Sequence, residues 1–170
     1  MPSLSGVAHV TLTVRHLRRS EAWYRDLFGF EVVRSEHGPH HDSVVMEQPG
    51  SALLLSLRQH HGAGTARFDE TRTGLDRITW AVTERGELDA WAALLTERHV
   101  EHSAIAETPS GAVLVLRDPD HIQLELSWRR DAPDGATGAD AVAERPAASE
   151  PAPVPDPTEP RPLQLPLIRS

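Results

Sequence analysis

The chain contains an internal repeat. Residues 6–14 read GVAHVTLTV and align with residues 74–82, GLDRITWAV, at an offset of 68. Trp23 and Trp91 share that offset, and residues 53–57 align with 122–126 at an offset of 69. Two copies of one unit predict a pseudo-symmetric fold. In such a fold His9 corresponds to Arg77, and Ser56 corresponds to Glu125.

The composition changes near Trp128. Residues 131–170 hold 9 of the 14 prolines, and Ala, Glu and Asp fill most of the rest. Such a segment buries too little apolar surface to offset the entropy lost on ordering. We therefore expect a disordered, partly polyproline tail over residues 129–170. Residues 163–168 are apolar again, and form either a frayed end or a short docking peptide for a partner.

Composition also limits the class of protein. There is no cysteine, so disulfides and thiolate metal sites are excluded. No run of about 18 apolar residues and no secretory signal is visible, which predicts a cytoplasmic protein without a membrane partner. The net charge of -8 argues against nucleic acid. All 17 basic residues are arginine, so no lysine can form a Schiff base.

Residues 4–128 are expected to fold as one domain of two modules, 4–59 and 74–128. Each module shows a strand, a helix and three further strands. In the first module, polar His9, Thr11 and Thr13 alternate with apolar residues, which predicts a strand with one polar face. Ser20 is the expected N-cap of a helix that ends at Gly29. The three strands that follow are expected at residues 30–35, 43–47 and 52–58.

The second module repeats this plan. A strand is expected at residues 75–82, and a helix with an apolar stripe at 87–98. A third element, at residues 100–106, is predicted to be a strand. Residues 112–116 and 122–127 should then form a hairpin across the turn at 118–120.

Four motifs in this order resemble the vicinal oxygen chelate superfamily. They are GVAHV at residues 6–10, WYRDLFGF at 23–30, GLDRI at 74–78 and DPDHIQLEL at 118–126. The superfamily includes glyoxalase I, extradiol dioxygenases, fosfomycin-modifying enzymes and bleomycin-binding proteins. The resemblance implies an α+β fold of tandem βαβββ modules, whose sheets curl into an open, barrel-like wall around a cavity. It further implies a small organic ligand or substrate and a homodimer.

The resemblance places four side chains at the cavity positions where relatives hold a metal: His9, Ser56, Arg77 and Glu125. Relatives of the dioxygenase and fosfomycin type use two histidines and a glutamate, and Arg77 stands where the second histidine belongs. A guanidinium has no lone pair with which to ligate a metal. We therefore expect no cofactor, with Arg77 supplying the positive charge and pairing with Glu125. His9 is expected to hydrogen-bond the same carboxylate.

The alternative is a divalent metal, Fe, Mn, Zn or Ni, held by His9, Glu125 and a third ligand. His60 is the candidate, because it follows Ser56 by four residues. Five other histidines lie in turns or next to strands, where unliganded histidines are common: His37, His40, His41, His61 and His121.

Three further residues are substrate-binding candidates beside Ser56 and Arg77. Arg58 shares the inward direction of Ser56; it either holds a ligand carboxylate or phosphate, or pairs with Glu47 or Asp42 at the sheet edge. Thr11 and Thr79 either hydrogen-bond a ligand or are ordinary strand threonines.

Three functions therefore remain open. The first is a metal-free protein that binds a small oxygenated organic molecule, either to sequester it or to transfer a proton with His9 and Glu125 as catalytic groups. The second is a metal-dependent lyase, isomerase or dioxygenase. The third is a non-catalytic interaction module that acts through the tail.

Overall fold

The computed structural model describes residues 6–51, 53–62, 64 and 66–130. The tail expected at residues 129–170, with its apolar end at 163–168, lies outside the described residues except for its first two positions. The last strand includes Arg129, so the folded part extends one residue beyond the predicted boundary at 128.

The first module forms a four-stranded mixed sheet, sheet 1, in the order β1-β4-β3-β2. β1 is parallel to β4, and the other neighbours are antiparallel. The elements are β1 (Val10–Thr13), α1 (Leu17–Phe28), β2 (Glu31–His37), β3 (His41–Glu47) and β4 (Leu54–His60).

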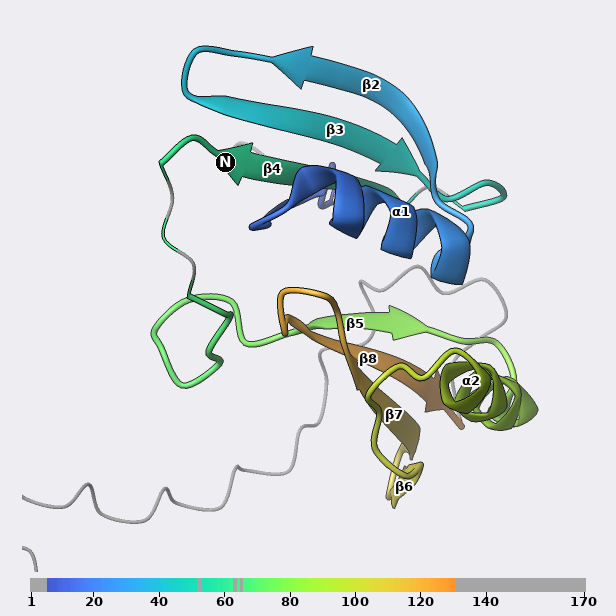
Figure 1. Ribbon diagram of the computed structural model, residues 1–170. Coiled ribbons are helices and arrows are strands. Elements are labelled where there is room, and N and C mark those ends of the chain that lie inside the picture. Colours follow the sequence, from blue (N-terminus) through green and yellow to red (C-terminus); the bar gives the residue numbers. More distant parts are fainter. Residues whose placement is uncertain (1–5, 52, 63, 65, 131–170) are drawn as a thin grey trace, which may run out of the picture. The chain divides into compact units, whose positions relative to one another are not determined.

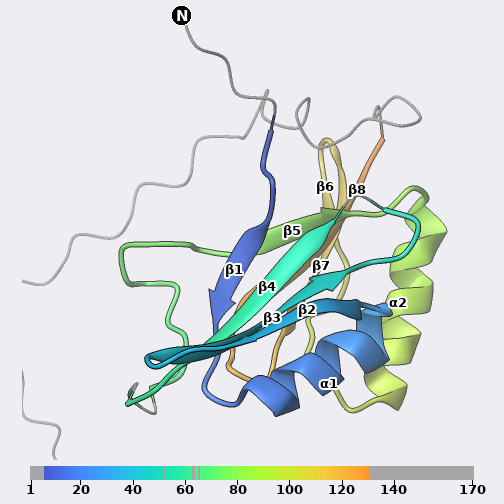
Figure 2. The ribbon, with the colours of Figure 1, turned by 90° about the horizontal axis from the view of Figure 1, so that it is seen from above.

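The second module repeats this topology in sheet 2, whose order is β5-β8-β7-β6 with β5 parallel to β8 (Figures 1 and 2). Its elements are β5 (Ile78–Ala81), α2 (Arg85–Glu97), β6 (Ala106–Thr108), β7 (Gly111–Arg117) and β8 (Gln123–Arg129). The predicted α+β class and the two βαβββ modules are confirmed.

The strand registers confirm the internal repeat at single-residue precision. Thr11 lies beside Ser56 in the parallel pair of sheet 1, and Thr79 lies beside Glu125 in that of sheet 2. Positions that correspond in the sequence therefore occupy corresponding places in the two sheets.

Two local predictions are wrong. Helix α1 begins at Leu17 after His16, so Ser20 is not its N-cap but lies inside the helix, 1% exposed. The first helical N–H, that of Leu17, is instead satisfied by Gln59 Oε1 at 2.8 Å, a residue 42 positions away that sequence spacing cannot identify. The predicted C-terminus is correct, because Gly29 takes the left-handed conformation at φ 72°.

The second error concerns residues 100–106. They do not form a strand, and only His102 makes an isolated bridge, to Leu116. The paired segment β6 is displaced to Ala106–Thr108. The alternating apolar residues of the predicted strand, such as Val100 and Ile105, pack against the core without strand pairing, which explains the misleading pattern.

Helix α1 packs against both modules. The apolar face of sheet 1 buries Leu12, Leu55 and Leu57 in one core with α1. On its other side α1 meets Trp80 of β5, whose ring centroid lies 4.6 Å from that of Phe28. In Figure 1, α1 accordingly lies between sheet 1 and β5. The apolar faces of both sheets are therefore turned toward α1.

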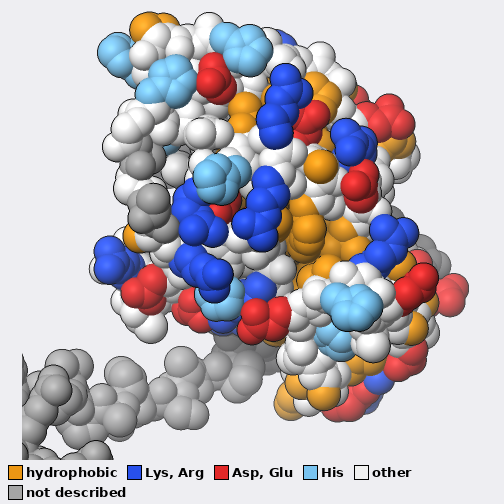
Figure 3. Space-filling model, in the orientation of Figure 1, with side chains coloured by type: hydrophobic (Ala, Val, Ile, Leu, Met, Phe, Trp, Pro, Cys, Tyr) orange, Lys and Arg blue, Asp and Glu red, His pale blue; other side chains and the backbone are white. Residues whose placement is uncertain are grey.

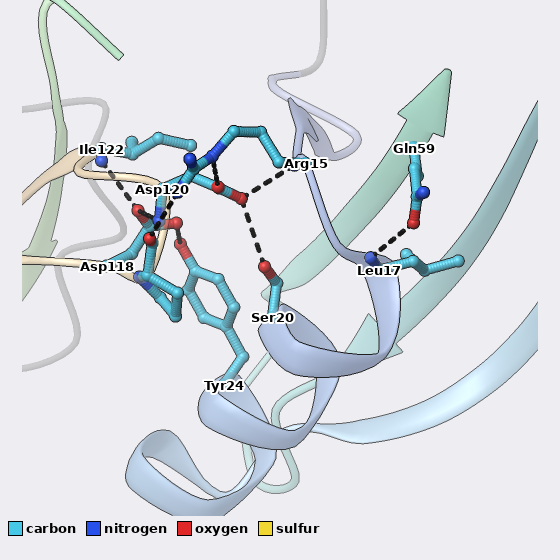
Figure 4. Close-up of polar contacts among 9 residues, drawn as sticks. Arg15, Leu17, Ser20, Tyr24, Gln59, Asp118, Asp120 and Ile122 are labelled. Atoms are coloured by element: carbon cyan, nitrogen blue, oxygen red, sulfur yellow. Dashed lines mark hydrogen bonds and ion pairs between the residues drawn. The ribbon is translucent and has the colours of Figure 1, made fainter. Parts of the chain in front are cut away.

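A buried polar network also fastens α1 to the turn between β7 and β8 (Figure 4). Tyr24 donates its hydroxyl to Asp118 Oδ2 at 3.1 Å, while Asp118 Oδ1 accepts the N–H groups of Asp120 and Ile122 at 2.8 and 2.7 Å. Asp120 in turn accepts from Arg15 Nε at 2.6 Å. Arg15 and Tyr24 belong to the first module, and Asp118 and Asp120 belong to the second. The network therefore fixes the two modules to each other.

Among the helices of the described residues, none has the length and hydropathy needed to cross a membrane.

Gly111 provides a test of how closely β7 and β8 approach each other. A Cβ at this position would collide with the carbonyl of Trp128 on the neighbouring strand. We expect Gly111→Ala to lower the free energy of unfolding by about 2 kcal/mol or more, measured by urea denaturation. Gly86→Ala is the matched control, because it lies in α2 with open space around it and should gain about 0.5–1 kcal/mol. Equal effects of the two substitutions would contradict the register.

Asp118 should make stability depend on pH. Burial raises its pKa from 3.8 to about 6, against the lowering effect of the hydrogen bonds from Ile122, Tyr24 and Asp120. The folded state therefore retains this proton to higher pH than the unfolded chain. Its contribution to the free energy of unfolding should fall by up to about 3 kcal/mol as pH rises from about 4 to about 6, and stay constant above that.

Urea denaturation of wild type and Asp118→Asn between pH 4 and 7 measures this contribution as a difference. Groups that both proteins share cancel, so the wild type should lose stability relative to the variant across this interval. Parallel profiles would show that Asp118 does not titrate there.

Candidate functional site

Alternation along the strands gives each sheet a polar face on the side away from α1. In sheet 1 this polar face carries four hydroxyl side chains and Arg58 on β1, β3 and β4: Thr11, Thr13, Ser43, Ser56 and Arg58. The same face also carries Glu36, His41, Glu47 and His60. In sheet 2 it carries Thr79, Arg117, Gln123, Glu125, Ser127 and Arg129, with Arg77 immediately before β5. Since α1 lies between the apolar faces and β1 is not paired with β5, the two polar faces do not oppose each other within the chain.

The polar face of sheet 2 is internally paired. Arg77 Nη1 donates to Glu125 Oε2 at 3.0 Å, and Thr79 donates its hydroxyl to Oε1 of the same carboxylate at 3.1 Å. Arg77 Nε also donates to Asp76, which is the main reason why the pKa of Arg77 is raised. The expected contact between Arg77 and Glu125 is therefore present, through one nitrogen rather than two. Each of the two carboxylate oxygens of Glu125 therefore accepts a hydrogen bond.

His9 lies away from this pair. It is exposed, and it makes no hydrogen bond with any of the residues described by the structure. The expected bond from His9 to Glu125 is thus not formed within the chain, and the second carboxylate oxygen accepts from Thr79 instead.

The side chains around Glu125 do not fit a divalent metal as they stand. Within the described ranges, no three histidine, aspartate or glutamate side chains converge on one point. Both oxygens of Glu125 already accept hydrogen bonds, and the neighbouring Arg77 offers a positive charge and no lone pair. A metal of the dioxygenase or glyoxalase kind needs at least three donors with open positions left over.

His60 lies with other histidines at one end of sheet 1. It pairs with His41 across β3 and β4, and the two ring centroids are 5.8 Å apart. Nearby, Asp42 accepts from His37 Nδ1 at 2.9 Å and from His61 Nε2 at 3.0 Å. Histidine side chains are conspicuous over this end of sheet 1 in Figure 3.

The polar face of sheet 1 is unsatisfied, in contrast to that of sheet 2. Arg58 makes no hydrogen bond or ion pair with any described residue, and its Nε is buried without a partner. It does not pair with Glu47, and Asp42 is bound to histidines instead, so the edge ion pair considered from the sequence is absent. Ser43 and Ser56 beside it are 3% and 5% exposed, and no side-chain hydrogen bond is formed by either.

Sequence reasoning missed Ser43. It lies directly across from Arg58 in the antiparallel pair of β3 and β4, so the two side chains share a face. The register of β3 and β4 would have identified Ser43, but the register can be predicted only when the ends of both strands are known. Tyr24 and Asp118 were also missed as a polar pair, because they lie 94 residues apart.

Two small pockets lie elsewhere on the described part of the chain. One, of about 170 Å³, is bounded by Thr13, Arg15, Phe68 and Asp120 where the linker crosses β1. The other, of about 240 Å³, is a shallow hollow on α2 beside Trp91. Neither is lined by Arg58, Arg77 or Glu125. The first pocket includes Thr13 of the polar face of sheet 1, whereas the second lies on α2.

These modules and their motifs match a known family model, that of the glyoxalase/bleomycin resistance protein/dioxygenase superfamily, over residues 6–126. The chain belongs to this superfamily. A glyoxalase/bleomycin resistance protein/dioxygenase domain from Frankia sp. EAN1pec is 38% identical, with a TM-score of 0.71, and the match covers 75% of this chain and 100% of that one. No curated protein matches the chain.

More distant superfamily structures show the same fold. The antibiotic binding protein TnmS3 from Streptomyces sp. CB03234 is 20% identical, with a TM-score of 0.59, over 76% of this chain and 99% of its own. A mutant of the fosfomycin resistance protein FosX from Listeria monocytogenes, complexed with Mn(II) and 1S,2S-dihydroxypropylphosphonic acid, is 19% identical, with a TM-score of 0.57, over 74% and 90%. Members of the superfamily thus bind small molecules.

A double-mutant cycle tests whether Arg77 and Glu125 are energetically coupled. Arg77→Met, Glu125→Gln and the double variant should give a coupling of about 1 kcal/mol in the free energy of unfolding, since Glu125 is only 14% exposed while Arg77 is 35% exposed. The exposed pair Arg34 and Glu36 is the control and should show coupling near zero. No difference between the two cycles would mean that the ion pair of sheet 2 is incidental.

Proposed function

We propose that the chain is a metal-free binding protein for a small oxygenated organic molecule. The observation that carries this proposal is the asymmetry between the two polar faces. In sheet 2, Arg77 and Thr79 satisfy Glu125. In sheet 1, the buried Nε of Arg58 has no partner among the described residues, and the Ser43 and Ser56 hydroxyls beside it form no hydrogen bond with them. Buried polar groups cost free energy until they are bonded, so the second face is suited to receive the polar atoms of a ligand.

The metal-free part of the proposal rests on the place of Arg77. Its guanidinium lies against Glu125 and supplies a fixed positive charge, which a buried carboxylate otherwise obtains from a metal or a proton. In this role Arg77 and Glu125 form one wall of the site and orient ligand oxygens. Ser56, Arg58, Thr11 and Thr79 supply further hydrogen-bonding groups.

Binding is favoured over proton transfer by the same contacts. Each oxygen of Glu125 already accepts a hydrogen bond, from Arg77 or from Thr79. A general base must lie within hydrogen-bond reach of the proton that it removes. These two contacts hold the carboxylate in a fixed position beside a cation, which suits it to orienting a ligand.

We propose further that a second copy of the chain completes the site. A small-molecule site usually surrounds most of its ligand, whereas neither of the two small pockets is lined by Arg58, Arg77 or Glu125. Two copies related by a twofold axis can place sheet 1 of one opposite sheet 2 of the other, twice over. The unsatisfied face would then meet the satisfied one across a shared cavity.

Native mass spectrometry of the full chain, purified without a histidine tag, tests both parts together. We expect the mass of a dimer without a divalent metal. A monomer would contradict the shared cavity. Stoichiometric iron, manganese, zinc or nickel would contradict the metal-free site and favour a lyase, isomerase or dioxygenase that uses His9 and Glu125.

Arg77→His tests the role of the guanidinium from the other side. The substitution replaces a cation by an imidazole donor beside Glu125, so binding of Mn²⁺ or Zn²⁺ should appear or strengthen by about tenfold or more, measured by isothermal titration calorimetry. Arg98→His, at an exposed arginine without a carboxylate partner in the described residues, is the control. Unchanged affinity at position 77 would show that this residue does not face the candidate ligand set.

A further inference from the structure

We infer that Arg58 binds a negatively charged oxygen group of the ligand, a carboxylate or a phosphate-like group. This inference rests on the proposed function, because it names the chemical class of the molecule bound on the polar face of sheet 1. It adds a specific contact: the guanidinium of Arg58 meets the anion, while Ser43 and Ser56 donate to its remaining oxygens.

The first argument is the missing partner. Two buried side-chain nitrogens lack a hydrogen-bond acceptor in the described residues, Arg58 Nε and Trp80 Nε1. Trp80 is explained by its place in the aromatic cluster with Tyr24 and Phe28. Arg58 has no such explanation: its side chain is half-buried and always charged, and its buried Nε–H lacks an acceptor among the described residues.

The second argument is the position of the neighbours. Thr13 flanks Arg58 on β1 and Ser43 flanks it on β3, both directly paired by strand register. Ser56 precedes it by two residues and therefore points to the same side of β4. All three neighbours carry hydroxyls, and none of these hydroxyls is hydrogen-bonded to a described residue. The carboxylate opposite Ser43 on β2, Glu36, is paired with Arg34 instead. A cation ringed by free hydroxyl donors is suited to an anion with several oxygens.

The third argument comes from the repeat. The residue that corresponds to Arg58 in sheet 2 is Ser127, which pairs with Ala81 where Arg58 pairs with Thr13. The residue that corresponds to Ser43 is Val113, which also lies opposite Ser127. The cation and its hydroxyls are therefore found in only one of the two modules, so they are not required by the fold itself.

The geometry also sets the mode of contact. Because the Nε of Arg58 is buried, a ligand meets the two Nη groups, which lie side by side and match two oxygens of a carboxylate, phosphate or phosphonate. Lysine offers a single point charge and cannot reproduce that fork. A neutral amide of the same shape has one acceptor oxygen and no charge, so it should bind more weakly.

Isothermal titration calorimetry of the full chain with three matched probes tests the inference. The probes are benzoate, phenylphosphonate and the neutral benzamide. We expect at least one anion to bind about tenfold or more tighter than benzamide, and Arg58→Gln to lose that advantage. Arg58→Lys should recover only part of it. Arg98→Gln, an exposed arginine without a partner in the described residues, should behave as wild type. The tighter of the two anions identifies the group.

The outcomes separate this inference from the proposed function. Equal binding of benzamide and the anions, unaffected by Arg58→Gln, would overturn the anion contact and leave the small-molecule site standing. Binding of no probe would overturn both.

A second measurement excludes a purely structural role. Arg58→Met should leave Tm unchanged or higher without ligand, because an unsatisfied cation is removed. Arg117→Met is the control and should lower Tm, since Arg117 is paired with Glu70 at 2.6 and 3.1 Å. Benzoate or phenylphosphonate should raise the Tm of wild type and not that of Arg58→Met. A drop in Tm for Arg58→Met like that of the control would overturn the inference.

Discussion

The packing of α1 between the apolar faces of two sheets is the constraint on which the other features depend. Its apolar side chains contact sheet 1, while Phe28 and Tyr24 contact Trp80 of sheet 2. The hydrogen bond from Tyr24 to Asp118 and the ion pair of Arg15 with Asp120 fix this arrangement. Because each strand alternates its side chains, an apolar face turned toward α1 leaves a polar face turned away from it. The direction of the candidate ligand face of sheet 1 follows from α1, and that of sheet 2 follows from α2 together with α1.

Duplication gave the chain two equivalent polar faces, and substitution has made them different. In sheet 2 a carboxylate, a guanidinium and a hydroxyl bind one another, so Glu125 is satisfied without a ligand. In sheet 1 the Nε of Arg58 has no acceptor among the described residues, and the hydroxyls beside it form no side-chain hydrogen bond with them. A shared site between two copies would therefore combine a preorganised wall with one that requires an anion. This division between the two faces is a physical basis for ligand specificity in a fold whose members bind different small molecules.

The sequence predicted the modules well and their contacts less well. The order of strands and helix along each module and the contact of Arg77 with Glu125 could be predicted. Both depend on alternation within strands and on positions that correspond between the two copies. Sequence reasoning failed at Ser20, whose capping role is taken by Gln59, and at residues 100–106, whose apolar pattern reflects packing rather than pairing. It also did not decide whether Arg58 binds a ligand anion or pairs with Glu47 or Asp42. These features depend on contacts between residues that are distant in the chain, and local sequence patterns do not predict such contacts. The hydrogen bond between Tyr24 and Asp118 is another example.

The central claim is that Arg77, and not a bound metal, supplies the positive charge beside Glu125. It is tested most directly by a crystal structure of the full protein from crystals soaked in Mn²⁺, with anomalous diffraction data. We expect the guanidinium of Arg77 within hydrogen-bond distance of Glu125 and no anomalous peak beside that carboxylate. A peak within bonding distance of Glu125 and His9, with Arg77 displaced toward solvent, would contradict the metal-free site.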